Sequence, residues 1–220
     1  MPSITVVAHT KGGTSKSTTA VNLATMSQAA GRDTVLVDSD TGQSSRRWAG
    51  ARAANSALPF IQCVTLFDNG GDYHRQLRAL AERHDEVIVD VGGEGQGARE
   101  IRLALTVANR VVTPCRPAPA DVQRLDAMHA MIDQALDLNP DLDAMLFPVQ
   151  ASTNAKASDV VTFYEKAAEF PRFRLLEAVV CMRDAYKAWP ETGEAIFEQA
   201  KLDKKAMAEM SKLFKEVFNG

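Results

Sequence analysis

The sequence predicts an α/β fold in which a doubly wound, mostly parallel sheet carries helices on both faces. β-Branched apolar runs alternate with helical patterns along almost the whole chain, the order that builds such sheets. Several runs contain few polar positions, which is typical of strands buried on both faces. The first run ends at a glycine-rich loop that opens a helical pattern. We therefore expect a single domain covering residues 1–220.

The elements follow in order from these patterns. The first strand is predicted over residues 4–8 and the helix after its loop over residues 17–30, with Gly31 just beyond its end. Further strands are predicted over residues 34–38, 60–66, 86–91, 110–115, 144–149 and 175–182. The clearest later helix is predicted over residues 121–136, where apolar side chains recur at spacings of three and four.

The composition is that of an ordinary globular domain, with 45% apolar and 24% charged residues. The net charge of −3 means that attraction to nucleic acid would require a local basic patch. Cys63, Cys115 and Cys181 lack metal-binding spacing and are expected to be buried thiols in a reducing compartment. No signal peptide or apolar run of membrane-spanning length is evident, so we expect a cytoplasmic protein.

The segment TKGGTSKS, residues 10–17, is a candidate phosphate loop, because it follows a strand and opens a helix. In this position the backbone N–H groups of Gly12 to Lys16 would surround a β-phosphate. Lys16 would bridge the β- and γ-phosphates, and the Ser17 hydroxyl would ligate Mg²⁺. The alternative is a glycine-rich turn without a ligand.

Acidic residues at the ends of predicted strands favour the nucleotide interpretation. Asp38 and Asp40 close the second strand, and Asp90 closes the strand at residues 86–91. The carboxyl edge of a parallel sheet is where α/β proteins bind their ligands. One such aspartate could simply cap a helix, but three beside Lys16 and Ser17 indicate a site for ATP and Mg²⁺. Ser17, Asp38 and Asp90 are the candidate metal ligands, the two aspartates acting through water.

These motifs resemble those of the ParA-type partition ATPases, which belong to the deviant Walker A, MinD–ParA branch of P-loop NTPases. The KGG-x-x-K-[ST] loop matches Lys11 to Ser17, and the short chain is most similar to the small ParF-like subgroup. VDSDTGQSSRRW, VTPCRPAPADV and CMRDAYKAWPETGEAIFE are similar to three further family segments. The matching positions are Asp38, Asp40, Ser44, Trp48, Pro114, Pro117, Pro119, Asp121, Arg183, Tyr186, Gly193 and Phe197.

The resemblance implies that Lys11 reaches across an ATP-dependent sandwich dimer to the phosphates bound by the other subunit. An additional cation at the γ-phosphate would stabilise the charge of the transition state. Lys11, Lys16 and Asp40 are then the catalytic candidates, with Asp40 orienting the attacking water. The residues expected to hold the nucleotide are Lys11, Gly12, Gly13, Thr14, Ser15, Lys16, Ser17 and Thr18. Gly92 and Gly93 follow Asp90 where a γ-phosphate-sensing loop or an ordinary turn would lie.

Two departures from the family pattern bear on turnover. Ser15 replaces the glycine before Lys16, and a Cβ there would cost about 1 kcal/mol if φ is positive. Thr41 and Gly42 replace the usual Pro-Gln after Asp40, which alters the segment expected to position water. Slow hydrolysis, or a nucleotide-binding switch with little hydrolysis, would follow from these changes.

The resemblance also implies partners: non-specific DNA bound by the ATP dimer, and a ParB- or ParG-like centromere-binding protein that stimulates hydrolysis. The ATP state would then associate with the nucleoid. The candidate DNA contacts are Arg172, Arg174, Arg183, Lys187, Lys204 and Lys205, although a solvated charged surface explains them equally well. MAEMSKLFKEVF, residues 207–218, predicts an amphipathic helix that docks on the domain rather than on a membrane.

The preferred prediction is thus a partition ATPase for plasmid or chromosome. Related alternatives are positioning of another cargo, such as a chemotaxis cluster, a carboxysome or the division machinery. A reductase of the nitrogenase iron-protein type also carries a KGG loop, but it needs paired cluster-binding cysteines that this sequence does not supply convincingly.

Overall fold

The computed structural model describes residues 2–93, 97–154, 158–187 and 189–219. Its described residues form an eight-stranded sheet in the order β3-β2-β4-β1-β5-β6-β7, with β8 pairing to β6, and every pairing is parallel. The strands are β1 (Ser3–Val7), β2 (Thr34–Ser39), β3 (Gln62–Thr65), β4 (Glu86–Val91), β5 (Arg110–Cys115), β6 (Asp143–Ala151), β7 (Arg174–Leu175) and β8 (Val180–Cys181). The predicted fold class is therefore confirmed.

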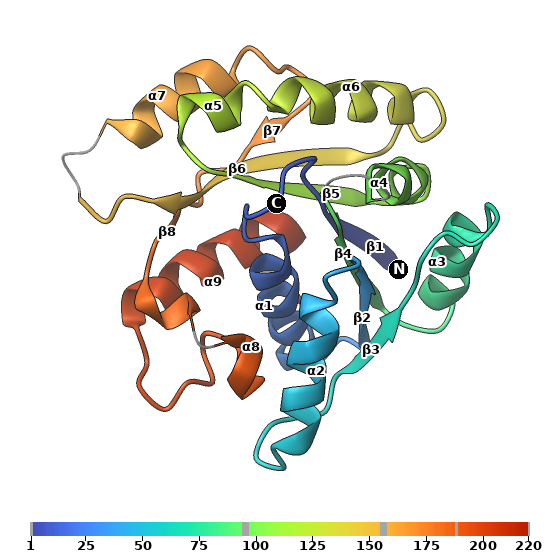
Figure 1. Cartoon of the computed structure of the whole chain (residues 1–220), viewed down its shortest axis with the longest axis vertical. Coiled ribbons are helices and arrows are strands. Elements are labelled where there is room, and N and C mark those ends of the chain that lie inside the picture. Colours follow the sequence, from blue (N-terminus) through green and yellow to red (C-terminus); the bar gives the residue numbers. More distant parts are fainter. Residues whose placement is uncertain (1, 94–96, 155–157, 188, 220) are drawn as a thin grey trace.

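Helices cover both faces of the sheet (Figure 1). One face carries α1 (Lys16–Ala29), α2 (Ser44–Ala54), α8 (Trp189–Thr192) and α9 (Lys204–Phe218). The other carries α3 (Tyr73–Ala81), α4 (Gly97–Leu105), α5 (Pro119–Val122), α6 (Leu125–Leu136) and α7 (Asp159–Ala167). A short 3₁₀ turn, η1, covers Asp184–Tyr186. Each face has its own apolar cluster, so strands such as β4 are buried on both sides.

Two predicted elements are divided in the structure. The strand expected at residues 175–182 splits into β7 and β8, because the amides of Glu177 and Ala178 donate to the Glu216 carboxylate, at 2.8 and 3.3 Å, rather than to a strand. The helix expected at residues 121–136 is interrupted between α5 and α6. There the Arg124 amide donates to the Asp121 carbonyl, three residues back, which tightens and ends the first helix.

The carboxyl-terminal helix docks its apolar stripe on the domain, as predicted. Met210, Leu213 and Val217 of α9 are buried in the same cluster as the inner face of α1. Phe214 and Phe218 are partly buried beside them. No helix in the described part of the chain is both long and apolar enough to cross a bilayer.

A buried arginine fastens the carboxyl-terminal segment to α2. Arg52, 1% exposed, donates to the Gly193 carbonyl at 3.0 Å and forms two 2.7 Å bonds with the Glu198 carboxylate. Gly193 has φ +68°, and a Cβ there would overlap the Arg52 backbone. Gly193, which belongs to the family-like segment CMRDAYKAWPETGEAIFE, thus has a structural role: it allows this segment to pack directly against α2.

Candidate functional site

The candidate phosphate loop joins β1, a central strand of the sheet, to α1. Ser15 has φ 60° and ψ 27°, so the positive φ on which the predicted strain depended is present. Gly13 also has a positive φ, +74°. Lys16 is 6% exposed, and its Nζ donates to the Lys11 carbonyl at 2.9 Å. The Lys16 side chain therefore bonds back to the backbone of its own loop.

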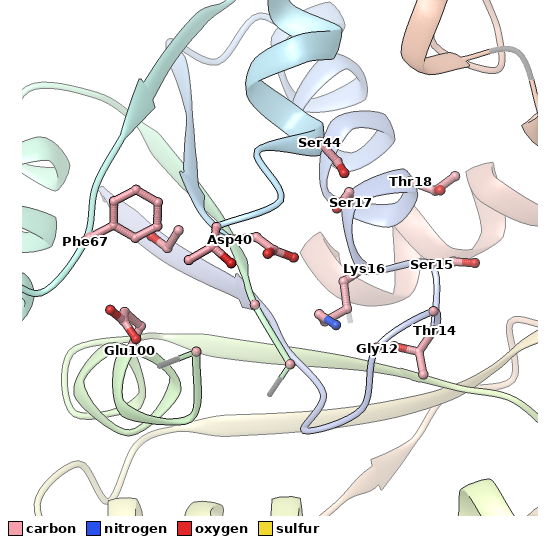
Figure 2. A pocket seen from close by; sticks show the side chains of 16 residues that line it. Gly12, Thr14, Ser15, Lys16, Ser17, Thr18, Asp40, Ser44, Phe67 and Glu100 are labelled. Carbon is pink, nitrogen blue, oxygen red and sulfur yellow. The ribbon is translucent and has the colours of Figure 1, made fainter. Parts of the chain in front are cut away.

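A cavity of about 550 Å³ opens directly above this loop. Figure 2 shows the Asp40 carboxylate and the Lys16 amine directed into the same space. Its lining residues are Gly12, Gly13, Thr14, Ser15, Lys16, Ser17, Thr18, Ser39, Asp40, Thr41, Ser44, Phe67, Gly92, Gly93, Gly97 and Glu100. The loop residues predicted to hold a nucleotide, apart from Lys11, thus surround one space.

The acidic residues meet at the carboxyl edge of the sheet, as the strand pattern indicated. Asp38 and Asp90 are register partners on β2 and β4, and both are fully buried. Asp38 accepts backbone hydrogen bonds from Asp40 at 3.0 Å and from Arg46 at 2.7 Å. These bonds fix the segment that carries Asp40, whose Oδ1 in turn accepts from the Gly42 amide at 2.9 Å.

Asp90 lies beneath two serine hydroxyls. Its Oδ2 accepts from Ser45 at 2.7 Å, and the Ser17 hydroxyl also hydrogen-bonds to this carboxylate. Burial raises the pKa of Asp90 to about 7 against these hydrogen bonds, and burial likewise raises the pKa of Asp38. A nearby cation would stabilise both ionised carboxylates.

Oxygen donors of this kind fit Mg²⁺, which binds through few protein ligands and keeps waters and phosphate oxygens in its shell. Within the described ranges, no group of three or more His, Cys, Asp or Glu side chains forms a metal-binding cluster. Ser17, Asp38 and Asp90 remain the predicted ligands; Ser17 lines the cavity and the two aspartates do not. Cys63, Cys115 and Cys181 are not joined in disulfides and lie on β3, β5 and β8.

Lys11 is directed elsewhere. Its ammonium forms an ion pair with Asp121 of α5, whose other oxygen accepts from Arg116 Nε at 2.7 Å. The Asp121 side chain is 2% exposed and that of Lys11 is 19% exposed. Of the two loop lysines, Lys16 lines the cavity and Lys11 does not.

The glycines after β4 touch both the loop and Asp40. A Cβ on Gly93 would lie 2.8 Å from the Lys11 carbonyl carbon and oxygen, and one on Gly92 would lie 3.4 Å from the Asp40 carboxyl carbon. This segment therefore packs directly against the phosphate loop.

Sequence reasoning missed several residues of the site. His9 and Gln150 contact the loop, Phe67 and Glu100 line its cavity, and Ser45 donates to Asp90. Gln150 follows a predicted strand, so the strand-end rule that identified Asp38 and Asp90 could have found it. Nothing in the local sequence distinguishes Phe67 or Glu100.

The candidate DNA-binding residues do not form one uniform surface. Arg172 pairs with Asp133, Arg174 with Asp143, and Lys187 with Asp184. Arg183 is largely buried and forms a forked ion pair with Glu209. Lys204 and Lys205 are exposed in the first turn of α9.

A strand, a glycine-rich loop with a buried lysine, a helix and facing carboxylates together define a P-loop nucleotide-binding protein. The chain belongs to the family described as the CobQ/CobB/MinD/ParA nucleotide binding domain, whose model matches residues 5–196.

Individual relatives agree with this assignment. The maintenance of carboxysome distribution protein A of Halothiobacillus neapolitanus is 24% identical over 213 residues, covering 96% of this chain and 94% of that protein. Protein ParA of Rhizobium radiobacter is 32% identical over 122 residues, covering 54% and 50%. A putative plasmid partition protein from Borrelia burgdorferi, solved with AMPPNP, has a TM-score of 0.73 at 18% identity and covers 100% and 99%.

Proposed function

We propose that this chain is a slow, Mg²⁺-dependent ATPase of the ParA type that positions DNA cargo, as in plasmid or chromosome partition. The observation that carries the proposal is that the two lysines of one loop point to different places. Lys16 lines the cavity, while Lys11 is held by Asp121 outside it. Because Lys11 is directed away from its own cavity, it would serve a second copy of the chain once its pair with Asp121 opens.

The residues supply positioning and charge rather than covalent chemistry, which suits phosphoryl transfer. Loop amides and Lys16 would hold the β- and γ-phosphates. Asp40, fixed through Asp38 and Gly42, would orient a water whose oxygen attacks the γ-phosphorus as the bond to the β-γ bridging oxygen breaks. Bound Mg²⁺ supplies charge neutralisation on the phosphate oxygens. The products are ADP and inorganic phosphate.

A second, smaller cavity would receive the base. It has a volume of about 150 Å³ and shares Ser15 and Thr18 with the first cavity. Val149, Val180, Met182, Tyr186 and Met210 supply apolar surface there. An apolar cavity beside a phosphate loop matches a nucleotide with one charged and one aromatic end.

Lys11 entering the partner's site would couple ATP binding to dimer formation. This dimer would bind DNA without sequence preference, and a centromere-binding protein would stimulate its ATP hydrolysis. Hydrolysis would then separate the subunits and release them from DNA.

The test is the solution mass measured by size-exclusion chromatography with light scattering, in ADP and in ATP. The native chain should be a monomer with ADP and a dimer with ATP. The Lys11→Ala variant should bind ATP but remain a monomer. Lys166 is an exposed lysine on α7, and the Lys166→Ala control should behave as the native chain does. A Lys11→Ala variant that dimerises normally would refute the proposal.

A protein compartment is the alternative cargo, and one observation favours it: the similarity to the carboxysome distribution protein spans nearly the whole chain. In that case the stimulating partner would bind a protein compartment instead of centromere DNA. Affinity capture with the protein bound to a non-hydrolysable ATP analogue distinguishes the two cargoes. It should identify a DNA-binding partner under the first proposal and a compartment-binding partner under the second.

A further alternative is a nucleotide switch that hydrolyses little ATP because of Ser15. Single-turnover phosphate release from the native chain and from Ser15→Gly separates the two. An enzyme should release one phosphate per bound ATP in both proteins, whereas a switch would release it only after the change to glycine.

A further inference from the structure

Gln150 interrupts the sheet beside the phosphate loop. Where β6 pairs with β8, Val149 is opposite Val180 and Ala151 is opposite Cys181, so Gln150 is an additional residue on the β6 side. It has φ 54°, in the left-handed region that glycine normally occupies. Such bulges are common beside active sites, where they redirect a side chain.

The redirected side chain contacts two loop residues. Gln150 Nε2 donates to the Gly13 carbonyl at 3.0 Å and to Ser15 Oγ at 2.8 Å. Both acceptor residues have positive φ, as Gln150 does. Two residues in unfavourable backbone conformations, Ser15 and Gln150, therefore meet through a hydrogen bond, at a cost that the surrounding structure must offset.

The bond to Gly13 orients a peptide group. In a trans peptide the carbonyl and the following N–H point in opposite directions. With its carbonyl held toward Gln150, the Gly13–Thr14 peptide directs the Thr14 N–H away from Gln150. Thr14 and Gly13 line the phosphate cavity, whereas Gln150 lines the second cavity. An N–H directed into the phosphate cavity is a donor for an anion.

Resting on the proposed function, we propose that Gln150 is a positioning residue that holds the phosphate loop ready for a polyphosphate before nucleotide arrives. Ser15 is then half of a hydrogen-bonded clasp with Gln150, rather than a defective glycine. The hydroxyl compensates for the strain that its own Cβ introduces at φ 60°.

The alternative role for this side chain is contact with the base alone, since Gln150 lines the second cavity. The two roles predict different responses to a ligand that has no base. Inorganic tripolyphosphate occupies the phosphate loop alone and therefore reports the state of the loop.

The experiment compares Kd values for tripolyphosphate and ATP by calorimetry, both with Mg²⁺. Gln150→Ala should weaken both ligands by about 10-fold, the effect of losing two modest hydrogen bonds that preorganise the loop. Gln150→Glu, which keeps the size but removes the amide donor, should weaken both at least as much. Gln134→Ala, on the exposed side of α6, should change neither.

Substitutions at Ser15 separate the hydroxyl from the Cβ. Ser15→Ala keeps the strained Cβ and loses the acceptor, so it should weaken tripolyphosphate by about 5-fold. Ser15→Gly removes the strain as well and should stay within about 2-fold of the native chain. In the Ser15→Gly background, Gln150→Ala should cost only about 3-fold. Unchanged thermal midpoints would show that the variants fold.

An effect of Gln150→Ala on ATP alone, with tripolyphosphate unchanged, would overturn the clasp in favour of a base contact. Native protein that binds ATP but not tripolyphosphate would also overturn it. If the native chain bound neither ligand, the proposed ATPase function itself would fail, and the clasp with it.

Discussion

The ammonium of Lys11 is ion-paired with the carboxylate of Asp121, 110 positions later in the chain. Asp121 is 2% exposed and also binds Arg116. If Lys11 is to enter a partner's site, this pair must break first. Under the proposed function, the pair would oppose dimer formation until ATP supplies a stronger anionic partner.

Asp121→Asn should lower the ATP concentration needed for half-maximal dimer formation by about 3- to 10-fold, the range for an ion pair worth about 1 kcal/mol. Light scattering across an ATP titration measures it. Asp133→Asn, which breaks the exposed pair with Arg172, is the matched control and should have no effect. An unchanged titration for Asp121→Asn would show that the pair does not restrain Lys11.

Gly93→Ala should displace the phosphate loop, because its Cβ would lie 2.8 Å from the Lys11 carbonyl atoms. We expect ATP affinity to fall more than about 10-fold, as for a backbone clash of 1.4 kcal/mol or more. Gly50→Ala in the exposed part of α2 has nothing within 4 Å and should stabilise the chain by up to about 1 kcal/mol. Normal ATP binding by Gly93→Ala would contradict the close packing of this segment.

His9 should make the folded state sensitive to acid. Burial, assisted by the charges of Lys16, Lys11 and Arg124, lowers the pKa of His9 to about 4. Between pH 6.5 and 4 the unfolded chain binds a proton at His9 and the folded chain does not. The free energy of unfolding therefore falls as pH falls. His9 should contribute a loss of up to about 3 kcal/mol over this range.

His9→Asn keeps an acceptor for the Lys11 amide, which donates to His9 Nδ1 at 3.0 Å. Urea unfolding of both proteins from pH 8 to 4 isolates the contribution of the imidazole as the difference between their pH profiles. Parallel profiles would show that His9 titrates normally in the folded chain.

Asp90 should act in the opposite direction, because burial raises its pKa to about 7. From pH 3.8 to 7 the folded chain binds more protons than the unfolded chain, so this group lowers stability as pH rises. Asp90→Asn should therefore stabilise the nucleotide-free chain at pH 8 by more than about 1 kcal/mol. The same change should abolish the increase in ATP affinity that Mg²⁺ gives to the native chain, and calorimetry with and without Mg²⁺ tests this.

The first turn of α9 should contribute more to DNA binding than the paired arginines. Lys204 and Lys205 are exposed there, whereas Arg172 and Arg174 already face aspartates. Lys204→Glu/Lys205→Glu should reduce the slope of log affinity against log salt by about 2, one for each lost phosphate contact. Arg172→Ala/Arg174→Ala should leave the slope nearly unchanged, as measured by fluorescence anisotropy on DNA in the ATP state. The reverse order would place the DNA surface on the β6–β7 edge.

Much of the site follows from the position of residues relative to strand ends. Asp38 and Asp90 could be placed together because parallel strands end at one edge, and their register confirms it. The sequence predicted strain at Ser15 only if its φ is positive, and the structure supplies that φ of 60°. The strand-end rule could have drawn attention to Gln150, but the contact of its side chain with the loop depends on a bulge in β6, which the strand pattern does not encode.

The sequence by itself determined the sheet, the phosphate loop and the family resemblance, because these depend on local periodicity and on a short contiguous motif. The tertiary structure decided which polar and charged side chains pair with one another within the chain. Lys11 meets Asp121, Arg183 meets Glu209, and Gln150 meets Ser15 only after distant segments pack together. Such pairings depend on the direction of side chains in three dimensions, which no spacing along one strand or helix encodes.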